Sequence, residues 1–550
     1  MSDPVVTGEE LDKRASAEVV VTETLPTDNG EALQARVLES VNHRNLNPRQ
    51  IHLASIAGAM GAALFVAIGQ GVSSGPLALL IGFVFWATVV FSIGQCQQEV
   101  VSLFPYDGAF IRLANRMVDP ALGVAVGWNH FFAQTSYVIF ECTVINTLLS
   151  VWGYDQSPAI MISISILLYF SINVYRADVF GEFEFWFALG KIIFAMGLLI
   201  YTLVVMCGGN PLHDAFGFRY WKNPGPWAGN TPTTRLQAFV NAVNVAGFSM
   251  GGPEYLSMIA GEAKDPRKVV PRAFKTLMWR LMIFFVGGGL CVGILLPSDN
   301  TEISDGENYA GKSPYVISMQ NLNIPILPSI VTGALIIVII SAGNAFTFNA
   351  SRSLHALALD GKAPKVLRRL NKNGVPWVAV CTVGALSCLA YLALGSTSSV
   401  VLNWILNFCT AATMFNWCVM AFTWIRFDKA MKAQGVDRLA LLPAPSKLQP
   451  YAGYWAFFWA FLFLWIQGYS VFLKGNWDVA TFIFNYGIIA LAGGIGLGWK
   501  IFARTPFRKP SDVDLETDLD FFDALTDYYQ QQKDEGPPAT LRDKILEKIF

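Results

Sequence analysis

The 550-residue chain is rich in apolar residues and poor in charge. Hydrophobic residues make up 53% of it and charged residues only 14%, whereas soluble domains average about 25% charged residues. The formal net charge is −1, and no basic tract suggests a nucleic-acid partner. The eight cysteines show neither metal-ligand spacing nor a disulfide framework, and no HExxH or GxSxG motif occurs. We therefore expect no nucleic acid, no metal, no cofactor and no enzymatic activity.

The apolar residues fall into runs of about 20, the length that an α-helix needs to cross the hydrocarbon core of a bilayer. We predict an all-α, polytopic membrane protein with twelve transmembrane helices. The predicted spans are 52–72, 77–104, 123–150, 158–176, 184–207, 236–261, 274–296, 326–350, 375–394, 400–425, 453–473 and 478–503. We expect a disordered polar tail over 1–49, a membrane domain over 50–504 and a second tail over 505–550.

Positive charge in the short loops predicts the orientation of the chain. With the N-terminus in the cytoplasm, the cytoplasmic loops hold most of the loop lysine and arginine residues. The opposite loops hold only Arg219, Lys222, Arg235, Lys312 and Lys474. We therefore expect both termini to be cytoplasmic, where trafficking and ubiquitination machinery would reach the tails. The apolar residues of 541–550 are spaced like one face of a helix, which fits a partner-binding or interfacial tail as well as a regulatory one.

The sixth span is interrupted in its middle. The string Phe248-Ser-Met-Gly-Gly-Pro253 follows an apolar start, and Glu254 comes directly after it. Because proline lacks the backbone N–H and glycine is a poor helix former, no continuous helix is expected here. Unpaired backbone groups cost several kcal/mol in hydrocarbon. Such a break therefore survives only where it lines a cavity or holds a ligand.

The first span contains a run of small residues, Ala57-Gly-Ala-Met-Gly-Ala-Ala63. Gly58 and Gly61 permit local unwinding, although small residues also serve close helix packing. The first and sixth spans are separated by a block of five, which predicts two five-span inverted repeats that each open with an interrupted helix. Free N–H groups at such breaks suit a carboxylate, and free carbonyls suit an ammonium group. The two breaks together would complement a zwitterionic α-amino acid.

Motifs spread from about residue 46 to 504 carry a family resemblance. They include Ser74-Gly-Pro76, Asp119-Pro-Ala-Leu-Gly123, Gly127-Trp-Asn129, Phe180-Gly-Glu-Phe-Glu-Phe-Trp186, Asp265-Pro266, Ser351-Arg-Ser-Leu354, Ala363-Pro-Lys365, Gly374-Val-Pro376, Ile425-Arg-Phe427 and Gln434-Gly435. With these motifs the chain resembles the fungal amino acid permeases of the amino acid–polyamine–organocation superfamily.

The resemblance implies a leucine-transporter-like core of ten helices plus two more, and proton-coupled amino acid uptake at the plasma membrane. The chain departs from the family at Gly61-Ala62-Ala63, where Gly-Thr-Gly or Gly-Ser-Gly is usual. A hydroxyl is lost there, so the range of substrates stays open.

Candidate substrate-binding residues lie at the two breaks and on neighbouring spans: Gly58, Gly61, Ala62, Ala63, Phe248, Ser249, Gly251, Gly252, Glu254, Glu141 and Asn344. Glu141 would line the substrate side or make an interhelical pair. Asn344 would donate to the cavity or make an ordinary interhelical hydrogen bond. Glu99, near the end of the second span, is expected to be structural.

Lys191 and Glu254 are the candidates for proton coupling. Lys191 lies inside the fifth span, where a charge is costly and therefore points to a function. In some proton-coupled members of the superfamily a lysine on this helix takes the place of a sodium ion, and Lys191 is similar in position. The alternative is a structural pair with Glu184, or a side chain that extends toward the membrane interface. Glu254 would bind the substrate amine or the proton, or else hold the unwound backbone.

These observations predict a secondary active transporter that takes up amino acids by proton symport. Its partners would be the amino acid, protons and the lipid bilayer, and its energy would come from the membrane potential, about 2.3 kcal/mol per charge per 100 mV. Two alternatives stay open. One is a polyamine, choline or γ-aminobutyrate transporter of the same fold, and the other is a non-transporting amino acid sensor.

Overall fold

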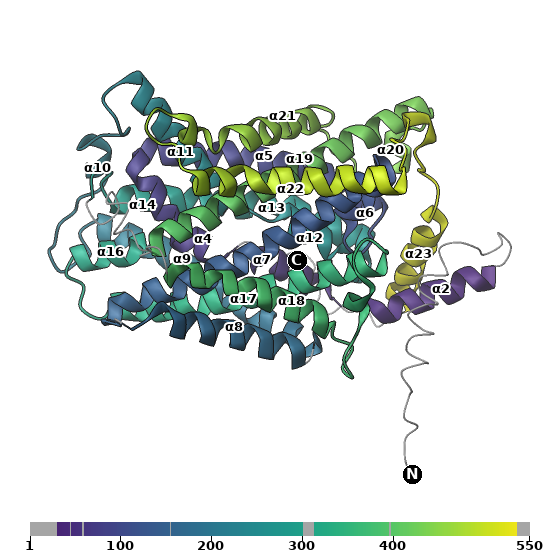
Figure 1. The fold of residues 1–550 in the computed structure, drawn as a ribbon, viewed down its shortest axis with the longest axis horizontal. Helices are drawn as coiled ribbons and strands as arrows, with labels where there is room; N and C mark the ends of the chain where they lie inside the picture. Colours follow the sequence, from purple (N-terminus) through teal and green to yellow (C-terminus); the bar gives the residue numbers. More distant parts are fainter. Residues whose placement is uncertain are drawn as a thin grey trace, which may run out of the picture.

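A computed structural model describes residues 30–44, 46–57, 60–154, 156–175, 177–300, 313–394 and 398–535. Within these ranges the ordered elements are helices, and the only strand-like pairing is an isolated parallel bridge between Leu46 and Ala263. The long helices run alongside one another in one bundle (Figure 1). The predicted all-α, polytopic class is confirmed.

Nine helices of the described chain are long and apolar enough to cross a membrane, and each coincides with a predicted span. They are α5 (Pro76–Leu103), α7 (Pro120–Leu149), α8 (Pro158–Tyr175), α9 (Ala177–Met206), the continuous run of α13 (Pro266–Arg280), η4 (Leu281–Val286) and α14 (Gly287–Leu295), then α17 (Leu327–Leu359), α18 (Trp377–Ser387) with η6 (Cys388–Leu394), α19 (Ser398–Ala433) and α22 (Val479–Ala503).

The other three predicted spans are short or interrupted helices, so the count of twelve stays a prediction. The first comprises α3 (Pro48–Ala57), α4 (Ala62–Phe65) and η1 (Ala67–Ser74), the sixth comprises α11 (Pro232–Ser249) and α12 (Pro253–Met258), and the eleventh is α21 (Tyr451–Ile466). The connections contain η2 (Ser150–Trp152), α6 (Ala109–Met117), α10 (Arg219–Lys222), η3 (Ala260–Glu262), α16 (Pro314–Asn321), η5 (Lys365–Arg368), α20 (Arg438–Leu441), η7 (Tyr469–Phe472) and η8 (Pro510–Asp512).

Capping side chains fix where several of these helices begin. Asp119 accepts a hydrogen bond from the Ala121 N–H at 2.8 Å and starts α7, and Asp478 accepts one from the Thr481 N–H at 2.7 Å and starts α22. Thr231 forms a reciprocal capping box at the start of α11. These bonds satisfy N–H groups that the first turn of a helix leaves without an internal partner.

Two buried tryptophans tie α5, α11 and α19 together at the centre of the core. The rings of Trp86 on α5 and Trp417 on α19 lie 5.3 Å apart between centroids, and the Trp86 Nε1–H donates to the Val243 carbonyl of α11 at 2.7 Å. The half-helix α11 is thus held against two long helices just before it ends.

The two tails meet at one end of the bundle, where α2 (Gly30–His43) packs on α23 (Leu519–Glu535) (Figure 1). Asp518 accepts hydrogen bonds from Arg36 and from the Tyr106 hydroxyl, each at 2.7 Å. The predicted disordered tail over 1–49 therefore needs correction from Gly30 onward, because burial of Val37 among the apolar residues of α23 stabilises α2 as a helix. The predicted amphipathic segment 541–550 lies outside the described residues.

Candidate functional site

The first and sixth predicted spans are interrupted where the sequence indicates. In the first span, extended backbone at Gly61 (φ −129°, ψ −157°) precedes α4, while Gly58 lies outside the described residues. In the sixth span, α11 ends at Ser249 and α12 starts at Pro253. Between them Gly252 has φ 140°, a conformation that only glycine adopts readily. Both interruptions leave main-chain groups outside regular helix.

The two interruptions lie against each other. The hydroxyl of Ser249 lies within hydrogen-bonding distance of the Ala63 carbonyl at 3.2 Å and of the Val245 carbonyl at 2.8 Å. Ala63 lies in the first turn of α4, directly after the first interruption, and Ser249 is the last residue of α11 before the second. One side chain therefore links the second interruption to the first.

Glu141 of α7 reaches the first interruption and binds its backbone. The Ala62 N–H donates to the two carboxylate oxygens of Glu141, at 3.1 and 3.4 Å, and the side chain is 1% exposed. A Cβ on Gly61 would stand 2.4 Å from Glu141 Oε1. Because the φ of Gly61 suits any residue, it is this close approach that requires glycine. The Glu141 carboxylate thus binds a backbone N–H of the first interruption, where we expect the carboxylate of the substrate to bind.

Lys191 of α9 lies behind this contact in a buried charged cluster. Its ammonium is 3.8 Å from Glu184 Oε1, and Ser341 of α17 donates to Glu184 Oε2 at 3.4 Å. The Coulombic attraction of Lys191 extends to Glu141 as well. Lys191 therefore pairs with Glu184, as the structural alternative requires. Its charge also attracts Glu141, the residue that binds the first interruption.

Glu254 binds the backbone of the second interruption and also contacts α19. Its Oε1 accepts from the Gly252 N–H at 3.2 Å, and its Oε2 accepts from the indole N–H of Trp417 at 3.0 Å. Gly251 is close to the same carboxylate, since a Cβ there would stand 3.1 Å from Oε1. Both oxygens of Glu254 are therefore engaged, one by unwound backbone and one by α19.

Residues of both interruptions line one cavity of ≈ 30 Å³. It is lined by Gly61, Ala63, Gln134, Tyr137, Glu141, Phe248, Ser249, Gly251, Gly252, Glu254, Tyr255 and Phe346. Eight of the predicted substrate-binding residues are in this lining. Ala62 is absent from it and contributes its N–H to Glu141. The volume suffices for about two ordered water molecules.

The sequence reasoning missed Gln134, Tyr137, Tyr255 and Phe346. The ring of Tyr137 stacks between Phe248, 5.7 Å away, and Phe346, 4.8 Å away. Gln134 is buried, and its side-chain oxygen has no partner among the described residues. Gln134 and Tyr137 could have been found from the sequence. They lie seven and four residues before Glu141, and this helical spacing places all three on one face of α7.

Two further residues are structural rather than cavity-lining. Asn344 accepts a hydrogen bond from Asn173 of α8 at 2.7 Å, the interhelical alternative left open above. Glu99 is fully buried, forms an ion pair with Arg438 and accepts from the indole of Trp424 at 2.8 Å.

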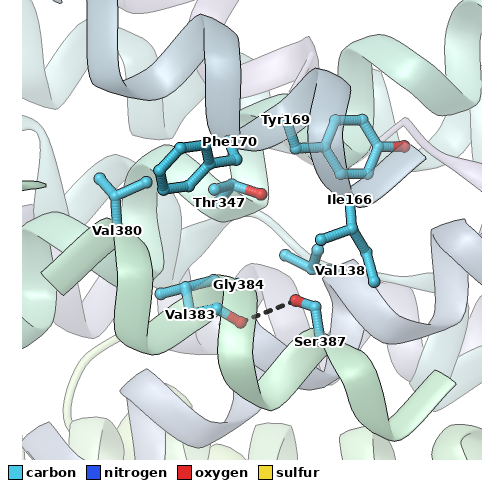
Figure 2. A pocket seen from close by; sticks show the side chains of 9 residues that line it. All are labelled: Val138, Ile166, Tyr169, Phe170, Thr347, Val380, Val383, Gly384 and Ser387. Carbon is cyan, nitrogen blue, oxygen red and sulfur yellow. Dashed lines mark hydrogen bonds between the residues drawn. The ribbon is translucent and has the colours of Figure 1, made fainter. Parts of the chain in front are cut away.

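A second cavity lies between α7, α8, α17 and α18 and measures only ≈ 10 Å³ (Figure 2). Most of its walls are apolar, and the Ser387 hydroxyl that faces it already donates to the Val383 carbonyl at 2.8 Å. The buried hydroxyl of Tyr169, another lining residue, has no hydrogen-bond partner among the described residues. We interpret the cavity as a packing gap, because its volume is far below that of a ligand pocket.

The chain is similar in sequence to known amino acid permeases. The chain matches the family model described as amino acid permease over residues 50–511. A general amino acid permease of Saccharomyces cerevisiae is 39% identical over 492 residues, which cover 86% of this chain and 82% of that protein. A proline-specific permease of Emericella nidulans is 33% identical over 493 residues, which cover 88% of this chain and 89% of that protein. A crystal structure of a manganese transporter from Eremococcus coleocola covers 88% of this chain and 98% of its own, with TM-score 0.49 and 12% identity.

The family match spans most of the chain, and the two relatives share more than 30% identity with it over most of their own length. The structure supplies the apolar helices that such a protein needs. The chain is thus a multi-pass membrane transport protein rather than an enzyme, and it belongs to the amino acid permease family.

Proposed function

We propose that this chain takes up amino acids across the plasma membrane by proton symport, with the substrate held between the two interrupted helices. Membership of the amino acid permease family supports amino acid transport. The observation that carries the site is the pair of interruptions facing one small cavity, with the Ala62 N–H already bound to a carboxylate.

In this proposal the substrate carboxylate takes the place of Glu141 at the Ala62 N–H. The two carboxylates would stand side by side in a site of low dielectric, where two like charges repel strongly. A transported proton relieves that repulsion by neutralising one of them. Lys191 takes part because its charge attracts both Glu184 and Glu141, so gain or loss of its proton changes the charge balance at the first interruption.

The substrate ammonium group would lie at the second interruption. There α11 ends at Ser249 and presents carbonyl groups at the negative end of its dipole, and Glu254 adds a carboxylate. Glu254 is thereby the second proposed proton-coupling group, because a proton on it would weaken the hold on a cationic amine.

The substrate side chain would face the stacked rings of Phe248, Tyr137 and Phe346. The cavity of ≈ 30 Å³ is smaller than an amino acid, so the rings must separate when a substrate enters. We propose these rings as the element that sets side-chain preference and closes over the substrate. One relative is named a general amino acid permease and another a proline-specific permease. This difference is consistent with a side-chain pocket that differs between members of the family.

The test is radiolabelled uptake in a cell that lacks its own amino acid permeases, with and without a proton ionophore. Symport predicts concentrative uptake that the ionophore abolishes. Excess of a decarboxylated analogue should not compete, because it lacks the group that binds the Ala62 N–H. Competition by polyamines, choline or γ-aminobutyrate would instead support the first alternative, and binding without uptake at the cell surface would support a sensor.

The orientation can be checked in the same cells. We propose that both termini face the cytoplasm, supported by the loop charges and by the contact of α2 with α23. Epitope tags at either end should be labelled only after the membrane is permeabilised. A tag that is labelled on intact cells would refute this orientation.

A further inference from the structure

A third, larger hollow opens on the outside of the bundle, away from the two interruptions. It has a volume of ≈ 480 Å³, against ≈ 30 Å³ for the central cavity, and so falls within the roughly 300–1,000 Å³ typical of ligand pockets. Its walls come from α7, α19, α21 and α22, from the connection between α6 and α7, and from Phe507 beyond α22. The residues in helices are Ala121, Leu122, Ala125, Phe415, Cys418, Val419, Phe422, Phe457, Phe461, Leu464, Trp465, Ile489, Ala492, Gly493, Gly496 and Lys500, and those in the connection are Val118 and Asp119. We call it the α21–α22 groove.

Small residues on α22 create the groove. Helices α21 and α22 both pack on α19, and α22 also packs on α7. A Cβ on Gly496 would stand 3.0 Å from the Ala125 Cβ, so this residue lets α22 approach α7. A Cβ on Gly493 would meet nothing within 4 Å, although Gly493 lines the groove. The missing side chain leaves open space between α21 and α22.

The groove is apolar along its length and polar only at the end near the tails. At that end Lys500 forms an ion pair with Asp119, which also accepts from the Thr505 hydroxyl at 2.9 Å. Along α22 the lining runs from Ile489 to Lys500, about 16 Å at 1.5 Å per residue. That is about half of the roughly 30 Å hydrocarbon core, or the depth of one leaflet.

Positive charge gathers beside this polar end. Arg504, Arg508 and Lys509 follow Lys500 in the sequence, and no ion pair among the described residues engages their side chains. Arg426 stacks its guanidinium 4.7 Å from the ring centroid of Phe507, a groove residue, and donates to the Arg508 carbonyl. The negative charge of Asp119 is already neutralised by Lys500, so the net charge at the mouth is positive.

We propose that the α21–α22 groove holds one acyl chain of an anionic glycerophospholipid from the leaflet at the tail end of the bundle. The chain would lie over Phe422, Phe457 and Phe461, and the headgroup phosphate would contact Arg504, Arg508 and Lys509. Charge complementarity selects an anionic headgroup over a zwitterionic one or a sterol hydroxyl, because basic clusters at the membrane surface attract anionic lipids by about 1 kcal/mol per residue. This proposal needs only a membrane and does not depend on the transported substrate.

The test is lipid retention by the purified full-length chain. The protein is placed in nanodiscs of phosphatidylcholine alone, with phosphatidylserine, or with ergosterol, then released into the gas phase for native mass spectrometry. We expect one phosphatidylserine to be retained per chain, several-fold more often than phosphatidylcholine or ergosterol. Equal retention of the three, or preferential retention of ergosterol, would overturn the proposal.

A matched pair of variants places the lipid. Gly493→Phe fills the groove, whereas Gly494→Phe sits on the adjacent position, where a Cβ also meets nothing within 4 Å but which does not line the groove. We expect Gly493→Phe to abolish retention and Gly494→Phe to leave it unchanged. Retention that survives in Gly493→Phe, or that falls equally in both variants, would refute the site.

A second variant covers the headgroup in case Gly493→Phe does not fold. The double change of Arg504→Gln and Arg508→Gln alters only side chains outside the helices. It should lower retention of phosphatidylserine to the level of phosphatidylcholine. Undiminished selectivity for phosphatidylserine in this variant would show that charge at the mouth does not select the lipid.

Discussion

Replacing Gly61 by alanine tests whether a substrate carboxylate binds the first interruption. The added Cβ would lie 2.4 Å from the position that Glu141 Oε1 occupies beside the Ala62 N–H, and 3.1 Å from the Ala342 Cβ. The backbone itself tolerates the change, because the φ of Gly61 is −129°. The main effect therefore falls on whichever carboxylate uses that amide, and Ala342 needs to shift only by a few tenths of an ångström.

The magnitude follows from the hydrogen bond that is lost. A hydrogen bond to a charged group contributes roughly 1.5–3 kcal/mol, and 1.4 kcal/mol corresponds to a factor of ten. We therefore expect Gly61→Ala to lower kcat/KM for amino acid uptake by roughly 10- to 150-fold. The assay is initial-rate uptake of a radiolabelled amino acid, normalised to the protein at the cell surface.

Two companion variants separate the possible causes. Gly190→Ala on α9 is the matched control, because a Cβ there meets nothing within 4 Å, and it should transport normally. The double variant Gly61→Ala with Glu141→Ala removes the clash with Glu141 but keeps the Cβ beside the amide. Our account predicts that it stays defective, and recovery of uptake, or a normal kcat/KM in Gly61→Ala, would refute the reasoning.

Three further predictions concern buried charged groups and their partners, two at the candidate site and one away from it. Lys191→Met should abolish pH-dependent, concentrative uptake while surface expression stays intact, because the charge facing Glu184 and Glu141 is gone; unaltered accumulation would remove Lys191 from the mechanism. Trp417→Phe should lower uptake by about tenfold, because Glu254 loses a donor worth roughly 1.5 kcal/mol. Trp404 lies on the same helix but donates to Thr481, so Trp404→Phe should leave uptake unchanged. Equal losses of uptake in the two variants would show that the hydrogen bond to Glu254 is not the cause. Glu99→Gln breaks a buried ion pair and should lower the free energy of unfolding by roughly 3 kcal/mol, seen as a lower melting temperature in detergent. KM for uptake should stay unchanged, and an altered KM would argue against a structural role.

The interruptions themselves were predictable from local chemistry. Two glycines followed by Pro253 cannot continue a helix, and the structure ends α11 at Ser249 and restarts at Pro253. The apolar runs likewise predicted the long helices, because span length is set by the bilayer. These features depend on a few neighbouring residues, which is why the sequence alone sufficed.

The contacts that complete the site were less accessible. The bond between Ala62 and Glu141 joins residues 79 positions apart, so it depends on how α7 packs and on no local pattern. The same holds for the pairing of Asn344 with Asn173. The helix α2 was missed because its own composition is polar, and it is stabilised by α23 nearly 500 residues away.

The most direct measurement is a cryo-electron microscopy structure of the full chain with its best-transported amino acid bound. Our account predicts the amino acid between the two interruptions, with its carboxylate within hydrogen-bonding distance of the Ala62 N–H, its ammonium group toward Ser249 and Glu254, and Glu141 displaced from the amide. An amino acid bound elsewhere, or one that leaves the bond between Glu141 and Ala62 intact, would contradict it.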